Sequence, residues 1–184
     1  SVRLIGEENL GSDFVLTKDT KNTYQTWIPE KEYEVKLGST VGDVFKQALD
    51  DNGLKYRGWE NGYISTIQSP EGYWLGEFTN GKYSGWMYTV NGSHPSLGLN
   101  EYKLIGDEEI VWHYVDDYRQ EVADWSESDK TGDGSLYNRW LYAKDTGSTT
   151  KPTTTPNATK QPQSGGSGSG GSTSTAKPTT APTV

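Results

Sequence analysis

The chain contains no cysteine and only one methionine among its 184 residues. The absence of cysteine excludes a disulfide scaffold, a thiol nucleophile and thiolate metal ligands. No run of about 18 apolar residues occurs, so the sequence predicts no membrane-spanning helix. His94 and His113 are the only histidines, which is too few for a typical zinc enzyme without cysteine. We therefore predict no metal site.

Acidic residues are absent from the last 39 residues, whereas residues 1–145 contain all 25 acidic side chains and 14 of the 17 basic ones. The first segment therefore has a net charge of −11. An acidic surface repels phosphate groups, so we expect neither nucleic acid nor an anionic membrane as a partner.

Residues 146–184 also lack aromatic side chains, and 29 of these 39 residues are Thr, Ser, Gly or Pro. Such a segment cannot bury enough apolar surface to offset the entropy lost on ordering, which predicts a disordered low-complexity linker. We thus divide the chain into a folded domain, 1–145, and a linker, 146–184. Linkers of this kind display modules on cell walls, so we expect a secreted, extracellular protein of the cell surface. We also expect other domains of a longer parent chain as partners.

Aromatic residues are the strongest feature of residues 1–145, which hold all 7 Trp, 12 Tyr and 3 Phe. Large rings supply much buried area per residue, so they can build a small core. A surplus of rings on one face would instead form a recognition patch. Composition leaves both interpretations open.

The pattern of apolar residues predicts a strand-rich domain. Pro29 ends one strand because proline cannot donate to a ladder. The run Ile110–Val115 is apolar on both faces, which indicates a central strand covered on both sides; we expect it to form a hairpin with Tyr102–Ile105. The strand candidates are Val2–Ile5, Thr23–Ile28, Glu32–Leu37, Gly62–Gln68, Tyr73–Phe78, Trp86–Val90, Tyr102–Ile105 and Ile110–Val115.

One stretch has helical periodicity. Apolar residues at spacings of three and four form a single stripe after Gly38, which predicts one main helix over about residues 40–52. Thr40 and Asp43 have the spacing of a capping box, and Gly53 suits a left-handed stop. The stripe consists of Val41, Val44, Phe45, Ala48 and Leu49.

Three blocks of the sequence resemble the transcobalamin-like C-terminal domain found in surface proteins of Gram-positive bacteria. They read SGWMYTVNGSHPSLG (84–98), YKL (102–104) and IVWHYVDDY (110–118). Upstream segments (TYQTWIP, STVGDVFKQAL and YWLGEFTNGKYSGW) resemble it in the same order. The resemblance implies an α+β fold with a β-grasp-like mixed sheet and one packed helix. In the cobalamin carriers the related domain covers one face of a corrinoid, held against a helical domain that this chain lacks.

Two functions follow as hypotheses. The first is a non-enzymatic surface module that binds a small ligand such as a corrinoid, here cobalamin. The second is a structural or adhesive module, an adhesin, that recognises host protein or glycan. Aromatic rings can stack on a corrinoid as well as on a glycan, so aromatic composition does not separate the two functions. The predicted ligand-contacting residues are Trp74, Trp86, Tyr88, Asn91, His94 and Trp112.

Catalysis is not expected. Adjacent carboxylates point to opposite faces of an extended chain, so the acidic pairs in this sequence do not make acid–base pairs, and no catalytic residue is predicted. Asp129 and Asp133 stand at the spacing that begins a calcium loop, but Trp140 occupies the position of the bidentate glutamate. We therefore favour a polar turn there, with calcium as the alternative.

Overall fold

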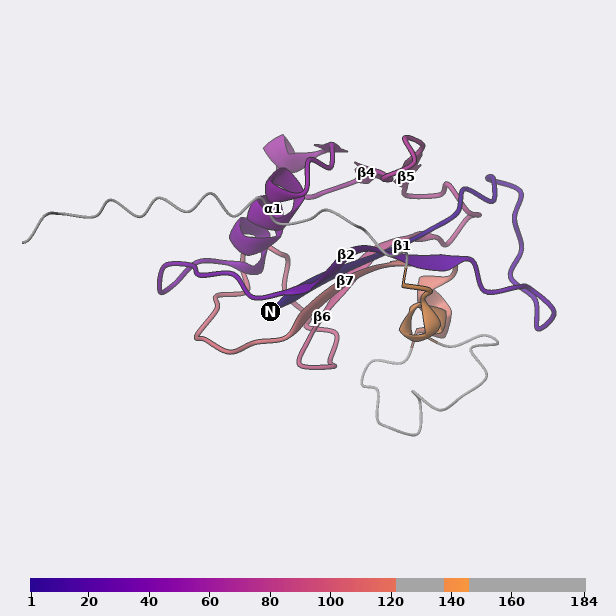
Figure 1. The fold of residues 1–184 in the computed structure, drawn as a ribbon. Coiled ribbons are helices and arrows are strands. Elements are labelled where there is room, and N and C mark those ends of the chain that lie inside the picture. The colour runs from indigo at the N-terminus through magenta and orange to yellow at the C-terminus, as the bar shows by residue number, and fades with distance from the viewer. Residues whose placement is uncertain (122–137, 146–184) are drawn as a thin grey trace, which may run out of the picture. The chain divides into compact units, whose positions relative to one another are not determined.

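The computed structural model describes residues 1–121 and 138–145, which form a mixed α+β domain (Figure 1). A four-stranded sheet has the order β2-β1-β7-β6 and a small three-stranded sheet the order β3-β4-β5. The larger sheet contains β1 (Val2–Glu7), β2 (Tyr24–Lys31), β6 (Gly85–Val90) and β7 (Ile110–Val115). The smaller contains β3 (Tyr56–Arg57), β4 (Thr66–Gln68) and β5 (Trp74–Gly76). The helices are α1 (Val41–Asp51) and the 3₁₀ turns η1 (Trp59–Asn61), η2 (Tyr118–Gln120) and η3 (Arg139–Tyr142).

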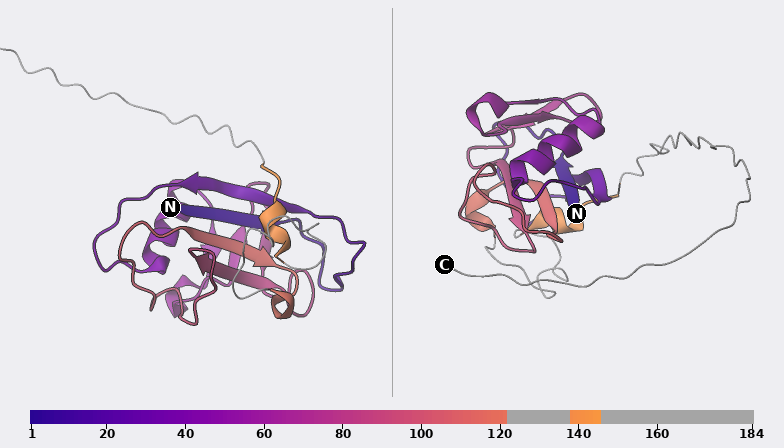
Figure 2. Two further views of the ribbon diagram at one scale, coloured as in Figure 1. Left: turned by 90° about the horizontal axis from the view of Figure 1, so that it is seen from below. Right: turned by 90° about the vertical axis from the view of Figure 1, so that its left-hand side faces the viewer.

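The larger sheet is covered on both faces. Helix α1 and the small sheet lie over one face, and η3 lies against the other (Figures 1 and 2). Strand β7 pairs with β1 in parallel and with β6 antiparallel, and all six of its residues are buried. The predicted central strand is thus confirmed. The chain forms a hairpin of β1 and β2, then α1, and later strand β7, which pairs parallel to β1. This is the expected β-grasp-like arrangement.

Helix α1 forms as its sequence predicts. The Thr40 hydroxyl accepts the backbone N–H of Asp43, whose carboxylate accepts that of Thr40, so the capping box is complete. Gly53 ends the helix with φ of 67°, a left-handed conformation that glycine adopts without strain. The predicted apolar stripe is buried along its whole length.

Two predicted strands are wrong. Residues 32–37 form no strand, because β2 continues through Pro29 to Lys31. A proline is tolerated there since β2 is an edge strand, whose outer side needs no N–H donor. Residues 102–105 contribute only an isolated bridge between Lys103 and Thr40, because β6 takes the place beside β7 that the predicted hairpin would need. The linker predicted at 146–184 and the calcium loop with Asp129 and Asp133 lie outside the described residues.

Candidate functional site

Strand β7 presents two chemically different faces. Alternation places Trp112 toward α1 and His113 toward η3. The ring of Phe45 in α1 stacks on Trp112, whereas the ring of Trp140 in η3 stacks on His113, each at a centroid distance of 3.9 Å. The sheet therefore separates an aromatic core from a second, more polar layer.

The predicted ligand-contacting rings of Trp86, Tyr88 and Trp112 lie on the α1 face. Trp112 is held between Phe45 and Tyr88, whose ring centroid is 5.4 Å away. Trp86 donates its Nε1–H to the carbonyl of Leu75 at 2.9 Å. Both tryptophans are buried, so in this structure their rings stabilise the core instead of facing a ligand.

The other predicted contact residues lie elsewhere. Trp74 is half-buried on β5, with the Arg57 guanidinium 4.1 Å from its ring centroid. Asn91 occupies the predicted tight turn after β6 with φ of 51°, and its Oδ1 accepts the Glu109 N–H at 2.9 Å. His94 follows in the same loop but turns to the η3 face. The six residues therefore do not converge on one site.

His94, His113 and Glu121 do converge. The two imidazole centroids are 5.3 Å apart. Glu121 Oε2 lies 3.9 Å from the Nε2 atom of each histidine. One ligand atom from each residue falls within 4.8 Å of the other two, so this group, which we call the His–His–Glu cluster, could hold a metal ion.

The surroundings of the His–His–Glu cluster are poorly solvated. Burial, followed by the charge of His94, lowers the pKa of His113 well below its usual value. Burial also raises the pKa of Glu121 to about 7, although the Trp140 Nε1–H donates to its Oε2 at 2.7 Å and opposes the rise. Without a cation, both groups are therefore driven toward their neutral forms.

The sequence pattern does not show that these three residues meet. His113 lies on the predicted central strand, and it is fully buried. Glu121 was not singled out, because it follows β7 in a stretch without a clear period. The sequence contains one hint of the site. Of its two histidines, one lies in a loop and the other on the predicted central strand.

A second buried polar group lies beside η3. Arg139 pairs with Asp116 and lies 3.9 Å from Glu7. Glu7 also accepts hydrogen bonds from Thr23 at 2.8 Å and Asn80 at 3.0 Å. Burial and the neighbouring Asp116 raise the pKa of Glu7 to about 9. The single guanidinium of Arg139 can balance the charge of only one of the two carboxyl groups, Glu7 and Asp116. Glu7 therefore holds its proton at neutral pH.

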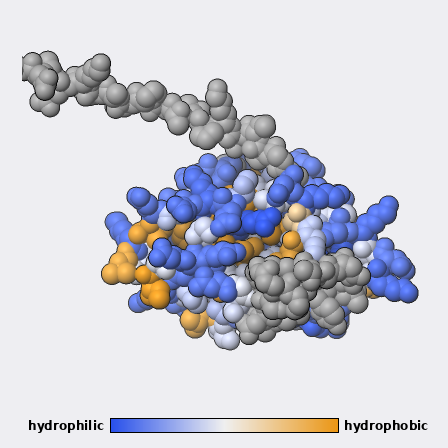
Figure 3. Space-filling view, turned by 60° about the horizontal axis from the view of Figure 1, so that its bottom comes forward, coloured by the Kyte–Doolittle hydropathy of each residue, from blue (hydrophilic) through white to orange (hydrophobic). Residues whose placement is uncertain are grey.

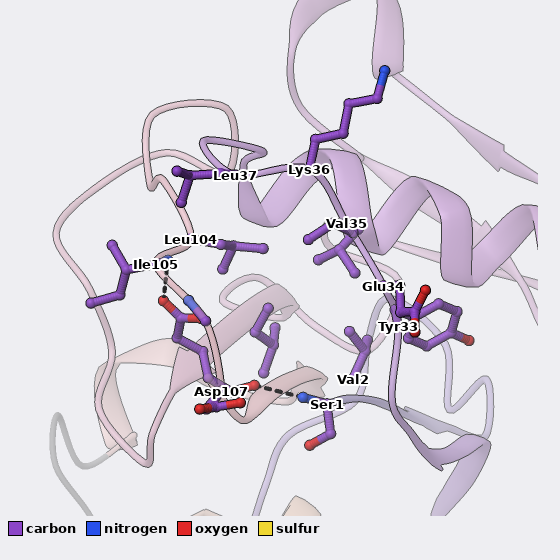
Figure 4. A pocket seen from close by; sticks show the side chains of 14 residues that line it. Ser1, Val2, Tyr33, Glu34, Val35, Lys36, Leu37, Leu104, Ile105 and Asp107 are labelled. Atoms are coloured by element: carbon purple, nitrogen blue, oxygen red, sulfur yellow. Dashed lines mark hydrogen bonds between the residues drawn. The ribbon is translucent and has the colours of Figure 1, made fainter. Parts of the chain in front are cut away.

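A surface hollow of about 500 Å³ lies between the segments 33–37 and 104–108 (Figure 4). On its rim Leu37 is 92% exposed and Ile105 is 85% exposed. Hydrophobic residues gather at the left-hand end of the described part in Figure 3, where Figure 1 places the loops after β2 and before β7. The floor is apolar and buried, formed by Val2, Val44, Leu104 and Ile110.

The turn at this hollow is fixed by its own hydrogen bonds. The carboxylate of Glu108 accepts the backbone N–H of Ile105 at 2.7 Å and that of Gly106 at 2.9 Å. These bonds lower the pKa of Glu108 against the opposing effect of burial. Ile105 is thus presented to solvent by a defined turn.

Comparison with known proteins gives a match to a protein family. A family model described as a domain of unknown function (DUF4430) matches residues 38–116. No curated protein and no solved structure matches the chain. Within the described residues, no helix has the length and apolar character needed to cross a membrane. The segment from the residues before α1 to the residue after β7 is therefore similar to a DUF4430 domain, a similarity that specifies no activity.

Proposed function

We infer that this chain is a non-enzymatic binding module of an extracellular surface protein, and that its ligand surface is the hollow between 33–37 and 104–108. The observation that supports this inference is the exposure of Leu37 and Ile105 beside an apolar floor. Two largely exposed aliphatic side chains at one opening are costly to hydrate, and contiguous apolar surface of this kind marks binding sites.

A small apolar or planar ligand fits this surface best. The volume of the hollow, about 500 Å³, lies within the ordinary range for small-molecule sites. A corrinoid such as cobalamin is the ligand suggested by the resemblance to transcobalamin-like C-terminal domains. The segments 84–98 and 102–104, which support that resemblance, fall within the span matched by DUF4430. The acidic domain and the Thr- and Pro-rich tail support an extracellular, cell-surface location.

Titration of the full chain with cobalamin tests this function. We expect quenching of tryptophan fluorescence at micromolar ligand. We expect this quenching to be lost in Leu37→Asp and Ile105→Asp, because a ligand bound over the rim would exclude water from the new carboxylate. Val15→Asp is the matched control, since Val15 is 74% exposed and does not line the hollow. Absence of quenching at tens of micromolar would refute the corrinoid assignment, and equal quenching in all three variants would refute the placement of the ligand in the hollow.

An adhesive function is the second candidate. The aliphatic side chains of the rim project outward beside the hollow, which also suits contact with the surface of a protein. The same variants distinguish the two functions. Binding to immobilised mucin that is lost in Ile105→Asp, without any response to cobalamin, would assign the hollow to a macromolecular partner.

A further inference from the structure

We propose that His94, His113 and Glu121 form a binding site for a divalent transition-metal ion of the Zn²⁺ class. The site is on the face of the sheet opposite α1, so it is independent of the hollow and of the function proposed for it. Two imidazole nitrogens and one carboxylate oxygen are a ligand set that such ions prefer, whereas Ca²⁺ and Mg²⁺ require oxygen ligands.

Both imidazoles are oriented for metal binding. His94 Nδ1 lies 3.2 Å from the carbonyl oxygen of Tyr88, and His113 Nδ1 lies 3.2 Å from that of Val111. A carbonyl oxygen only accepts, so each Nδ1 bears the proton and each neutral ring has its lone pair on Nε2. Metal-binding histidines are commonly fixed in this way through the other ring nitrogen.

The lone pairs face a third acceptor. Glu121 Oε2 is 3.9 Å from both Nε2 atoms, too far for a hydrogen bond. His113 is fully buried, and its Nε2 has no hydrogen-bond partner among the described residues. A buried polar atom without a partner costs free energy. A cation placed between the three atoms would supply the missing partner to His113.

Supporting contacts hold the ligands in place. The Trp140 Nε1–H donates to Glu121 Oε2 at 2.7 Å, and the ring of Trp140 stacks on His113 with 17° between the planes. Trp140 therefore touches two of the three ligands and is a positioning residue for the site. Hydrogen bonds to ligating carboxylates are a regular part of metal centres.

The spacing requires only a small contraction. Ligand atoms around tetrahedral Zn²⁺ are roughly 3.4 Å apart, from bond lengths of about 2.0–2.1 Å. The atoms here lie within 4.8 Å of one another, and His94 lies in the loop after β6, outside the hydrogen-bonded sheet. The His94 and Glu121 side chains are 11% and 7% exposed, so an ion can enter from solvent, and a water or an added ligand can take the fourth position.

Metal titration of the chain tests the proposal directly. The full chain is prepared without a histidine tag, stripped with a chelator and titrated with Zn²⁺ at pH 7.5 by calorimetry. Because the chain has no cysteine and only these two histidines, imidazole ligation reports this site alone. We expect one Zn²⁺ per chain, a higher melting temperature with the ion bound, and visible Co²⁺ absorption bands of intensity typical of tetrahedral coordination.

Three substitutions decide the assignment. His94→Gln and Glu121→Gln should weaken Zn²⁺ binding by about 100-fold or more, and Trp140→Phe by about 10- to 100-fold, as expected for loss of a supporting hydrogen bond. Glu109→Gln, an exposed carboxylate that does not contact the site, is the matched control. Circular dichroism of each variant verifies folding. Failure of the folded wild type to bind Zn²⁺, or unchanged binding in both His94→Gln and Glu121→Gln, would overturn the proposal and leave a packed His–His–Glu contact.

Discussion

The ring of Phe45 lies flat against the ring of Trp112, with 3.9 Å between the centroids and 4° between the planes. This contact joins α1 to the central strand. Phe45→Ala should reduce the free energy of unfolding by about 3–5 kcal/mol, because it removes buried area and leaves a cavity. Urea denaturation measures the change. Phe78→Ala is the control: Phe78 is 57% exposed, so its loss should change stability by about 0.5 kcal/mol or less. Equal effects of the two substitutions would contradict this role of Phe45.

The ring of Trp27 leaves no room for a side chain at Gly6. A Cβ atom at position 6 would lie 1.9 Å from Trp27 Cε2, whereas at Gly85 the nearest atom would be 3.8 Å away. Gly6→Ala should therefore cost about 1–3 kcal/mol through overpacking. Gly85→Ala, also in a strand, should be neutral or slightly stabilising, because alanine loses less backbone entropy on folding. Thermal melts compare the melting temperature of each variant with that of wild type. A Gly6→Ala variant as stable as wild type would show that Trp27 repacks freely.

Glu7 should make the domain less stable as pH rises. Burial and Asp116 raise the pKa of Glu7 from 4.5 to about 9, so between these values the folded state holds a proton that the unfolded state has released. The unfolded state then binds fewer protons, and the free energy of unfolding falls with increasing pH across this window.

The measurement is a series of urea denaturations from pH 6 to pH 9. Wild type should lose stability along the series. Glu7→Gln should largely remove the dependence above pH 7, because its amide does not titrate and Glu121, whose pKa burial raises to about 7, contributes mainly below that pH. Glu8→Gln, at the neighbouring exposed position, should behave as wild type. A pH dependence above pH 7 that persists in Glu7→Gln would assign it to another group.

Local signals in the sequence predict the local structure well. The stripe, the capping box and Gly53 define α1 because every determinant lies within about 14 residues of the chain. The run Ile110–Val115 predicts a central strand since only a strand covered on both sides needs apolar residues on both faces. The tight turn at Asn91 follows from its neighbour Gly92, and both residues have positive φ.

Long-range contacts are not predictable in this way. Tyr33, Val35 and Leu37 alternate like a half-buried strand, yet they border a hollow. The sequence contains no sign that β2 would pass through Pro29 or that β6 would occupy the place of residues 102–105. Glu121 meets His94 and His113 only because β7, the 91–98 loop and the end of η2 come together on one face. Trp86 and Trp112 were expected to contact a ligand, but aromatic composition does not reveal which face of a strand is closed.

The edge of the sheet at β2 has a consequence for association between molecules. Lys144 pairs with this edge: its N–H donates to the Tyr24 carbonyl at 3.0 Å, and its carbonyl accepts the Thr26 N–H at 2.9 Å. Farther along the same strand Pro29 offers no donor, and Glu30 and Lys31 are exposed charges. A strand from another copy therefore finds neither a continuous ladder nor an apolar surface there, which protects this edge against edge-to-edge aggregation.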